Sequence, residues 1–203
     1  MKKNKISKNW INKQRRDIYV RQSKIEGYRS RAVYKLIEID KKFNILKNGM
    51  SLVDLGSAPG SWSQYVSKHI KNCKILSIDL KDMENIDRVY HIKGDFIQKK
   101  YQQLIKNYFK SKIDVVLSDM VENTTGNKNV DSISTGELCK EAMYFAKEIL
   151  NEKGVFVSKI FMGSTFNEVM SESKLIFKET KVFKPTSSRK NSKESFIICK
   201  LLK

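Results

Sequence analysis

The sequence predicts an α/β fold, in which helices cover both faces of a mainly parallel, doubly wound sheet of seven strands. Two observations lead to this prediction. From residue 51 onward, short apolar runs alternate with segments of helical periodicity. Several runs, such as VVLS and VFVS, are continuously apolar, which is typical of strands covered on both faces. The length of 203 residues suits one such domain with a sizeable core.

The elements follow in order along the chain. The segment SRAVYKLIEIDKKF, residues 30–43, has apolar residues at helical spacing and predicts a helix that leads into the domain. Strands are expected at residues 51–55, 74–80, 89–92, 114–120, 154–161, 178–183 and 195–202. Helices are expected up to about residue 69, from about 98 to 109, up to about 150, and from about 165 to 176.

A capping box marks the expected start of the helix that ends near residue 150. Ser134 and Glu137 have the S-x-x-E spacing in which each side chain bonds to the backbone of the other residue. We therefore expect the helix to begin at Ser134 and the polar residues after Asp119 to form a loop. Ligands of open α/β sheets bind at such loops, beyond the carboxyl ends of the strands.

The net charge of +18 indicates a polyanionic partner, with nucleic acid as the first candidate and an anionic membrane surface as the second. Residues 1–48 carry 15 Lys or Arg and 4 Asp or Glu. We expect residues 1–27 to form a basic, flexible extension that binds RNA, with Trp10 and Tyr19 suited to base stacking, and residues 28–203 to form the domain. A basic tail that only raises solubility is the alternative.

The three cysteines, Cys73, Cys139 and Cys199, lack the spacing of a metal site and lie in or beside apolar runs, which indicates thiols in a reducing compartment. No apolar run approaches the roughly 18 residues that span a bilayer. The N-terminus lacks the apolar region of a signal peptide. We therefore expect a cytoplasmic protein with no membrane partner.

The stretch SLVDLGSAPGSWS, residues 51–63, predicts a strand, a glycine turn and the start of a helix. Gly56 and Gly60, on either side of Pro59, let the backbone approach a ligand at the helix N-terminus, where acidic groups are favoured. A nucleoside-bearing cofactor suits this site. A dinucleotide enzyme and a purely structural turn are the alternatives, although GxGxxG is absent. The pattern D-x-G-x-x-P-G resembles the first motif of S-adenosylmethionine-dependent methyltransferases.

Acidic residues follow the next two predicted strands. Asp79 lies about twenty residues after the glycine turn, where a carboxylate accepts hydrogen bonds from both ribose hydroxyls of a nucleoside. Asp95 and Phe96 fit an adenine, with the carboxylate at the amino group and the ring stacked or packed nearby. An acidic strand end in solvent is the alternative for Asp79.

Asp119, in LSDM, ends the fourth predicted strand, where methyltransferases place the group that receives the methyl. The residues after it lack both the D/N-P-P-Y/F motif of enzymes that methylate base amines and the Pro-Cys of cytosine C5 enzymes. A hydroxyl acceptor is therefore the better interpretation. A ribose 2′-hydroxyl needs a base that removes its proton and a frame that aligns oxygen, methyl and sulfur.

Lys159, in VSKIF, is a charged residue inside an apolar strand, and a buried lysine needs a partner. Lysine is a suitable base once neighbouring groups lower its pKa. An edge lysine whose ammonium reaches solvent is the alternative. Lys35, judged from its own helix alone, is expected to be an ordinary solvated lysine.

The motifs YRSRAVYKL, DLGSAPGSWS, LSDM, VSKIF and SSRKNSKESF occur in the order found in the FtsJ/RrmJ family, RNA 2′-O-ribose methyltransferases with a Rossmann-like fold. The resemblance covers about residues 28–202 and is greatest to the bacterial branch that methylates a uridine ribose of 23S-type large-subunit ribosomal RNA. It implies S-adenosylmethionine as cofactor and ribosomal RNA as partner, within a large subunit or its precursor. We also expect a monomer, and no metal, since methyl transfer from a sulfonium requires none.

The resemblance implies a catalytic tetrad of Lys35, Asp119, Lys159 and Glu194, with Lys159 as the general base. Asp119 would position Lys159, while Lys35 and Glu194 would hold the ribose. A nearby cation lowers the pKa of a lysine and a carboxylate raises it, so the sequence leaves the net direction open. The cofactor-binding residues that it implies, together with those inferred above, are Gly56, Pro59, Gly60, Trp62, Asp79, Asp95, Phe96 and Asp119.

The sequence departs from the family pattern at two places. Ser61 replaces the second glycine of PGGW, and Val121-Glu122 replaces the usual Ala-Pro after SDM, which puts target preference and loop conformation in doubt. A transfer RNA 2′-O-methyltransferase and a non-catalytic RNA-binding module remain alternatives. An RNA-holding rim is expected from six basic residues: Arg29, Arg31, Lys184, Arg189, Lys190 and Lys193.

Overall fold

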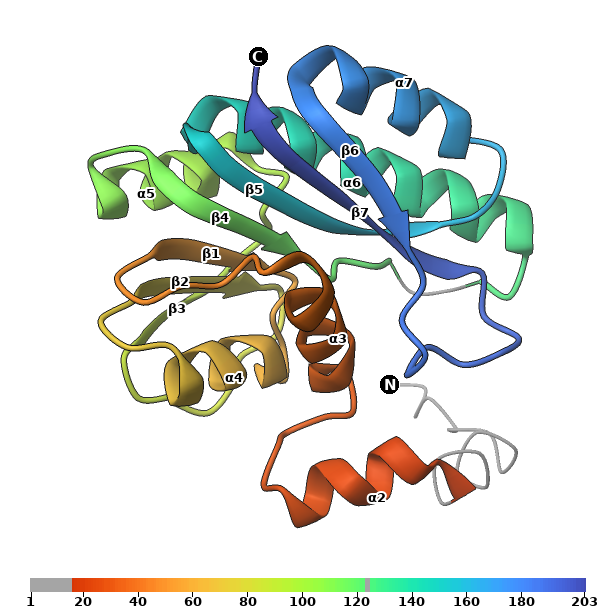
Figure 1. The fold of residues 1–203 in the computed structure, drawn as a ribbon, viewed down its shortest axis with the longest axis horizontal. Helices are drawn as coiled ribbons and strands as arrows, with labels where there is room; N and C mark the ends of the chain where they lie inside the picture. Colours follow the sequence, from red (N-terminus) through yellow and green to blue (C-terminus); the bar gives the residue numbers. More distant parts are fainter. Residues whose placement is uncertain (1–15, 123–124) are drawn as a thin grey trace, which may run out of the picture.

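The computed structural model describes residues 16–122 and 125–203. In this part of the chain, seven strands form one sheet in the order β3-β2-β1-β4-β5-β7-β6 (Figure 1). The strands are β1 Ser51–Leu55, β2 Lys74–Asp79, β3 Val89–Lys93, β4 Ile113–Ser118, β5 Leu150–Phe161, β6 Phe177–Phe183 and β7 Glu194–Leu202. The predicted α/β fold class and all seven predicted strands are confirmed.

The sheet is mixed, because β7 runs antiparallel to both of its neighbours, β5 and β6. The strands β1 to β5 are parallel to one another. Only ten residues, 184–193, join β6 to β7, and such a short connection reverses the chain, whereas a parallel pair needs a longer crossover. The reversal brings the first residue of β7, Glu194, opposite Phe161 at the carboxyl end of β5.

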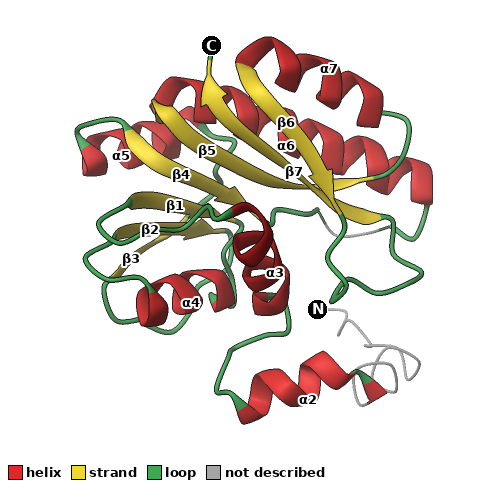
Figure 2. Ribbon diagram, in the orientation of Figure 1, coloured by secondary structure: helices red, strands yellow, loops and turns green. Residues whose placement is uncertain are grey.

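Helices cover both faces of the sheet (Figure 2). Apolar residues of α3 Val33–Phe43 and α4 Ser61–His69 pack on one face, in the cluster that includes Leu52, Ile75 and Leu117. Those of α5 Lys99–Phe109, α6 Lys128–Ile149 and α7 Phe166–Ile176 pack on the other, in the cluster that includes Val53. The alternation of strand side chains thus divides the core into two layers.

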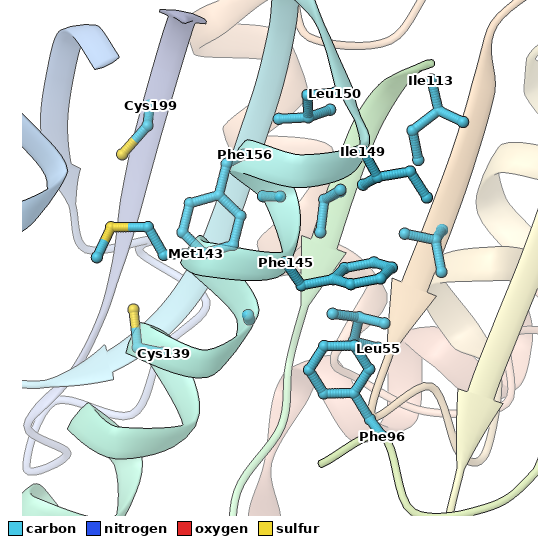
Figure 3. Packing of buried hydrophobic residues seen from close by; sticks show 14 of the residues in the cluster. Leu55, Phe96, Ile113, Cys139, Met143, Phe145, Ile149, Leu150, Phe156 and Cys199 are labelled. Carbon is cyan, nitrogen blue, oxygen red and sulfur yellow. The ribbon is translucent and has the colours of Figure 1, made fainter. Parts of the chain in front are cut away.

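Figure 3 shows the second of these layers, in which Phe145 of α6 lies edge-to-face with Phe96 at a ring separation of 5.1 Å. Cys139 and Cys199 are buried thiols in the same layer. The third cysteine, Cys73, is partly buried. The cysteines are therefore free and largely structural, as the sequence indicated.

The start of α6 differs from the sequence prediction. The helix begins at Lys128, and the side chain of Asn127 caps it by accepting hydrogen bonds from the backbone N–H groups of Asn129 and Val130. Ser134 and Glu137 therefore lie inside the helix, and the predicted capping box is wrong. Asn is as good a cap as Ser, so the motif at Ser134 was a competing signal within one continuous helix.

A further helix, α2 Ile18–Ile25, lies in the segment that was expected to be an extension, and the sequence analysis did not identify it. Asp17 caps it by accepting a hydrogen bond from the N–H of Tyr19. Figure 1 shows α2 set apart from the sheet on the side of α3. Trp10, assigned above to base stacking, lies outside the described residues.

Candidate active site

A buried ion pair joins the ends of two neighbouring strands. Asp119 follows β4, and the Nζ atom of Lys159, in β5, lies 2.6 Å from its Oδ1 atom. The same Nζ donates a hydrogen bond to the backbone oxygen of Asp119 at 3.1 Å. Only 7% of the Lys159 side chain is exposed. The expectation of a buried lysine with an acidic partner is therefore confirmed.

Lys35 and Glu194 complete the same cluster. The Nζ atom of Lys35, on α3, donates to Glu194 Oε2 at 2.7 Å, and this oxygen lies 3.9 Å from Nζ of Lys159. The Lys35 side chain is 13% exposed, so its interpretation as a solvated lysine is wrong. The structure brings together all four members of the expected tetrad, from α3, β5, β7 and the loop after β4.

The pairing of opposite charges outweighs the cost of burial in this cluster. Burial by itself raises the pKa of Asp119, but the ammonium groups of Lys159 and Lys35 hold that pKa below its usual value. Burial likewise opposes the charge of Lys35, but Asp119 and Glu194 raise its pKa. Both groups are therefore ionised at neutral pH, and Lys35 keeps its proton.

Two residues that the sequence analysis did not single out fix Glu194 or the loop that precedes it. Ser188 donates its hydroxyl to Glu194 Oε1 at 2.8 Å, which leaves Oε2 for the lysines. Glu38, on α3, accepts hydrogen bonds from both N–H groups and one hydroxyl of Thr186 and Ser187. Ser188 lies six residues before Glu194 in the segment SSRKNSKESF. This short separation was the one signal in the sequence that could have indicated a contact between them.

The glycine turn lies beside this cluster. Gly56 has φ +72°, and a Cβ atom placed on it would lie 2.7–2.9 Å from three atoms of Met120, including backbone. Gly60 has φ +100° and precedes the first residue of α4. Both positions therefore require glycine, and the turn presents backbone N–H groups at a helix N-terminus. Pro59 lies within the turn and its carbonyl accepts a hydrogen bond from Arg29.

Asp79 ends β2 and lies against the same turn. Its Oδ2 atom accepts the N–H of Ala58 at 2.9 Å, and its Oδ1 atom accepts the N–H of Lys81 at 2.8 Å. Each carboxylate oxygen has a second lone pair, so these bonds orient the group and leave it able to accept from two hydroxyls. The position agrees with the ribose role that was inferred from the spacing.

The remaining expected cofactor residues are placed differently. Asp95 accepts the N–H of Ile97 and the side-chain amide of Gln98. The ring of Phe96 is 4% exposed and packs in the core (Figure 3). The indole of Trp62 is 2% exposed and donates to the carbonyl of Ala32. The rings of Phe96 and Trp62 therefore serve packing.

Two residues of the expected RNA-holding rim bind the protein itself. The guanidinium of Arg29 donates to the carbonyls of Pro59, Glu84 and Asn85. Arg31 pairs with Asp17 and donates to the carbonyl of Ser187. Their assignment to RNA contact is therefore not supported. Lys190 and Lys193, in the loop before Glu194, are exposed.

No cluster of three or more His, Cys, Asp or Glu side chains is arranged to hold a metal ion among residues 16–122 and 125–203. Among the helices in these ranges, none combines the length and the apolar character that crossing a bilayer requires.

Known proteins are similar to this chain in sequence. Residues 28–202 match the family described as FtsJ-like methyltransferase. The ribosomal RNA large subunit methyltransferase E of Pelagibacter ubique (strain HTCC1062) is 64% identical over 203 residues, which is 100% of both chains. That of Rickettsia bellii (strain RML369-C) is 46% identical over 95% of this chain and 87% of its own.

A crystal structure named as a ribosomal RNA methyltransferase from Plasmodium falciparum is similar to this chain, with a TM-score of 0.76 and 34% identity. The match covers 86% of this chain and 98% of that chain. This similarity and the relatives above agree with the fold and with the positions of the motifs along the sequence.

Proposed function

Because the chain belongs to the FtsJ-like methyltransferase family, we propose that it transfers a methyl group from S-adenosylmethionine to a ribose 2′-hydroxyl of large-subunit ribosomal RNA. The target is a uridine. The observation that carries this proposal is the buried pair of Lys159 and Asp119, with Lys35 and Glu194 beside it, next to the glycine turn.

The tetrad suits proton transfer from a sugar hydroxyl. Lys159, in its neutral amine form, acts as the general base, and Asp119 holds its Nζ at 2.6 Å and so fixes its direction. Lys35 keeps its proton, since Asp119 and Glu194 raise its pKa. Its ammonium is therefore suited to donate a hydrogen bond to the sugar oxygen, while Glu194 accepts one from the sugar. Alignment of the hydroxyl in this frame contributes as much as the removal of its proton.

The residues at the turn fit the cofactor. Gly56 and Gly60 keep the backbone open, the first turn of α4 offers N–H groups, including that of Trp62, and Asp79 offers two oriented carboxylate oxygens. Asp95, beyond β3, would bind the adenine amino group, and Asp119 would face the positive centre. When bound, S-adenosylmethionine supplies an activated methyl group.

Ribosomal RNA is supported as the substrate by the names of the relatives and by the charge of +18. The basic residues 1–27 would extend the RNA contact beyond residues 28–203. Since the substrate is ribosomal RNA within a large subunit or its precursor, we place the protein in the cytoplasm and expect it to act as a monomer.

Replacement of the base tests the proposal. Lys159→Ala should lose methyl transfer by roughly 10²- to 10⁴-fold, because a positioned general base contributes about that much. Its affinity for S-adenosylmethionine should stay close to that of the wild type. Lys181→Ala, in which an exposed strand lysine is removed, is the matched control and should keep full activity.

The measurement is transfer of a labelled methyl group to a mixture of ribosomal and transfer RNA, followed by mapping of the modified nucleotide by mass spectrometry. Label on a ribose of large-subunit RNA in the wild type, and none with Lys159→Ala, is the expected result. Near-normal turnover by Lys159→Ala would remove this residue from the base role. Label on transfer RNA would instead support the alternative substrate class.

A further inference from the structure

Asp54, in the middle of β1, is a carboxyl group that the proposed chemistry does not use. Its exposed fraction is 0%. Ser63, in the first turn of α4, donates to Oδ2 from its backbone N–H at 3.1 Å and from its hydroxyl at 2.7 Å. The other oxygen, Oδ1, is buried and receives no hydrogen bond from the described residues. Such a half-satisfied carboxylate favours the protonated form.

Two further acids lie close to Asp54. The N–H of Asp119 donates to the carbonyl of Leu55, and Asp79 accepts the N–H of Ala58, so both acids are tied to the turn that follows Asp54. Their negative charges repel a charge on Asp54. Burial, with this repulsion added, raises the pKa of Asp54 to about 7.

The positive groups around Asp54 are already paired with other acids. From β5, Lys159 binds Asp119, and from α3, Lys35 binds Glu194. The other polar neighbours carry no fixed charge: Ser63 on α4, Ser77 on β2, which is in register with Asp54, and His91 on β3, whose Nδ1 bonds to Ser77. Within the described residues, Asp54 therefore has no cationic partner of its own.

We propose that Asp54 links cofactor binding to a proton and makes the site selective for a positively charged ligand. With no cation bound, Asp54 is protonated in about half of the molecules at pH 7. When a sulfonium-bearing ligand binds at the glycine turn, Asp54 releases this proton to solvent and becomes a carboxylate, which stabilises the positive charge. The inference rests on the proposed cofactor, and it adds a residue that distinguishes the cofactor from its demethylated product.

The distinction follows from the charges of the two ligands. S-adenosylmethionine carries a sulfonium, whereas S-adenosylhomocysteine has a neutral thioether at the same position and is otherwise alike. The proposal requires the sulfonium to lie within a few ångströms of Asp54, where a cation lowers the pKa of a carboxyl group by about 1 to 3. From a starting value of about 7, Asp54 would then be ionised at neutral pH. The neutral product leaves the protonation of Asp54 unchanged. It therefore gains no attraction to a carboxylate and binds more weakly than the cofactor does.

Isothermal titration calorimetry tests this with the full chain. Each ligand is titrated at pH 6.5 in three buffers of different ionisation enthalpy, and the slope gives the number of protons released. At this pH, S-adenosylmethionine should release between about half and three-quarters of a proton more than S-adenosylhomocysteine. The difference should vanish near pH 8.5, where Asp54 is already ionised.

Two variants assign the proton to Asp54. Asp54→Asn keeps an oxygen that accepts from Ser63 and should abolish the difference between the ligands. Ser63→Ala removes one hydrogen bond to the carboxylate, so the pKa of Asp54 should rise further and proton release should persist to higher pH. This second variant keeps the test open if Asp54→Asn folds poorly.

The pH dependence of the two dissociation constants gives a second, independent test of proton release. The ratio of the dissociation constants of product and cofactor should rise by about fivefold or more between pH 6 and pH 8 in the wild type, and stay constant in Asp54→Asn. Equal proton release for both ligands, or release that survives in Asp54→Asn, would overturn the role of Asp54 while leaving the proposed function intact. If neither ligand binds, both the role of Asp54 and the proposed function are overturned.

Discussion

The burial and charge pairing of Lys35 depend on residues that are distant from it in the sequence. Its own helix predicts an exposed lysine, yet its Nζ lies 2.7 Å from Glu194 and close to a second lysine. The two ammonium groups are tolerated together because each faces a carboxylate, Lys159 facing Asp119 and Lys35 facing Glu194. The tetrad is therefore balanced in charge, and removal of one acid leaves a buried cation.

The variant Glu194→Gln tests this balance. It keeps the size of the side chain but removes the negative charge opposite Lys35. We expect the free energy of unfolding to fall by about 3 kcal/mol, since loss of one partner from a buried pair costs about that much. Methyl transfer should fall with it. Thermal and urea unfolding measure the first effect.

Glu148→Gln is the matched control. Glu148 pairs with Lys106 at 2.5 Å, but 56% of its side chain is exposed. Exposed pairs contribute less than about 1 kcal/mol, so this variant should unfold almost as the wild type does. Equal losses for the two variants would contradict the special status of the buried pair.

At the level of elements, the reversed strand β7 matters most for the site. The strands β2, β4 and β5 run parallel to β1, so Asp79, Asp119 and Lys159 lie at the same end of the sheet, where these strands have their carboxyl ends. Glu194 reaches this end of the sheet because β7 is antiparallel to β5 and begins there. The loop of residues 184–193 therefore serves the site twice, since it reverses the chain and carries Ser188.

The start of α6 gives a prediction for an element. Asn127→Ala removes the side chain that accepts from Asn129 and Val130, and should lower the free energy of unfolding by about 1 kcal/mol. Ser134→Ala removes the first residue of the capping box expected from the sequence. It lies inside the helix, where alanine is favourable, and should be neutral or slightly stabilising. Chemical denaturation of both variants distinguishes the two starts, and a larger loss for Ser134→Ala would restore the capping box.

At the level of the whole molecule, the charge of +18 is the dominant property. It is suited to a polyanion because each basic group that contacts a phosphate releases a condensed counterion. Two of the arginines expected at the RNA-holding rim bind the protein itself: Arg29 donates to the carbonyl of Pro59 in the glycine turn, and Arg31 pairs with Asp17, the N-cap of α2. The remaining candidates for RNA contact include the exposed lysines before Glu194 and the basic residues at the N-terminus.

Salt dependence measures this property. Affinity for a large-subunit RNA fragment should fall steeply with salt, with a logarithmic slope of about 0.7 to 0.9 per phosphate contact. A chain that lacks residues 1–15, which hold six Lys or Arg and no Asp or Glu, should show a shallower slope and an unchanged affinity for the cofactor. An identical slope would exclude these residues from RNA contact. Filter binding at several salt concentrations provides the comparison.

Local pattern was sufficient for most of the fold. The strands were predictable because apolar runs record burial, and the glycine turn because positive φ angles and close approach to Met120 leave no room for a side chain. Lys159 was predictable as a buried charge for the same reason, since it interrupts an apolar run. The start of α6 was not, because two capping signals compete within eight residues and packing decides between them.

The sequence by itself determined the seven strands, most of the helices and the charge that favours a polyanionic partner, since each of these depends on local pattern or on composition. Only the tertiary structure decided that Lys35 and Ser188 bind Glu194 beside Lys159, and that one buried oxygen of Asp54 has no hydrogen-bond partner among the described residues. The physical reason is that pairing and burial of a charge depend on groups distant in sequence. The free energies of charge pairing and burial are therefore fixed only once the strands have paired in register.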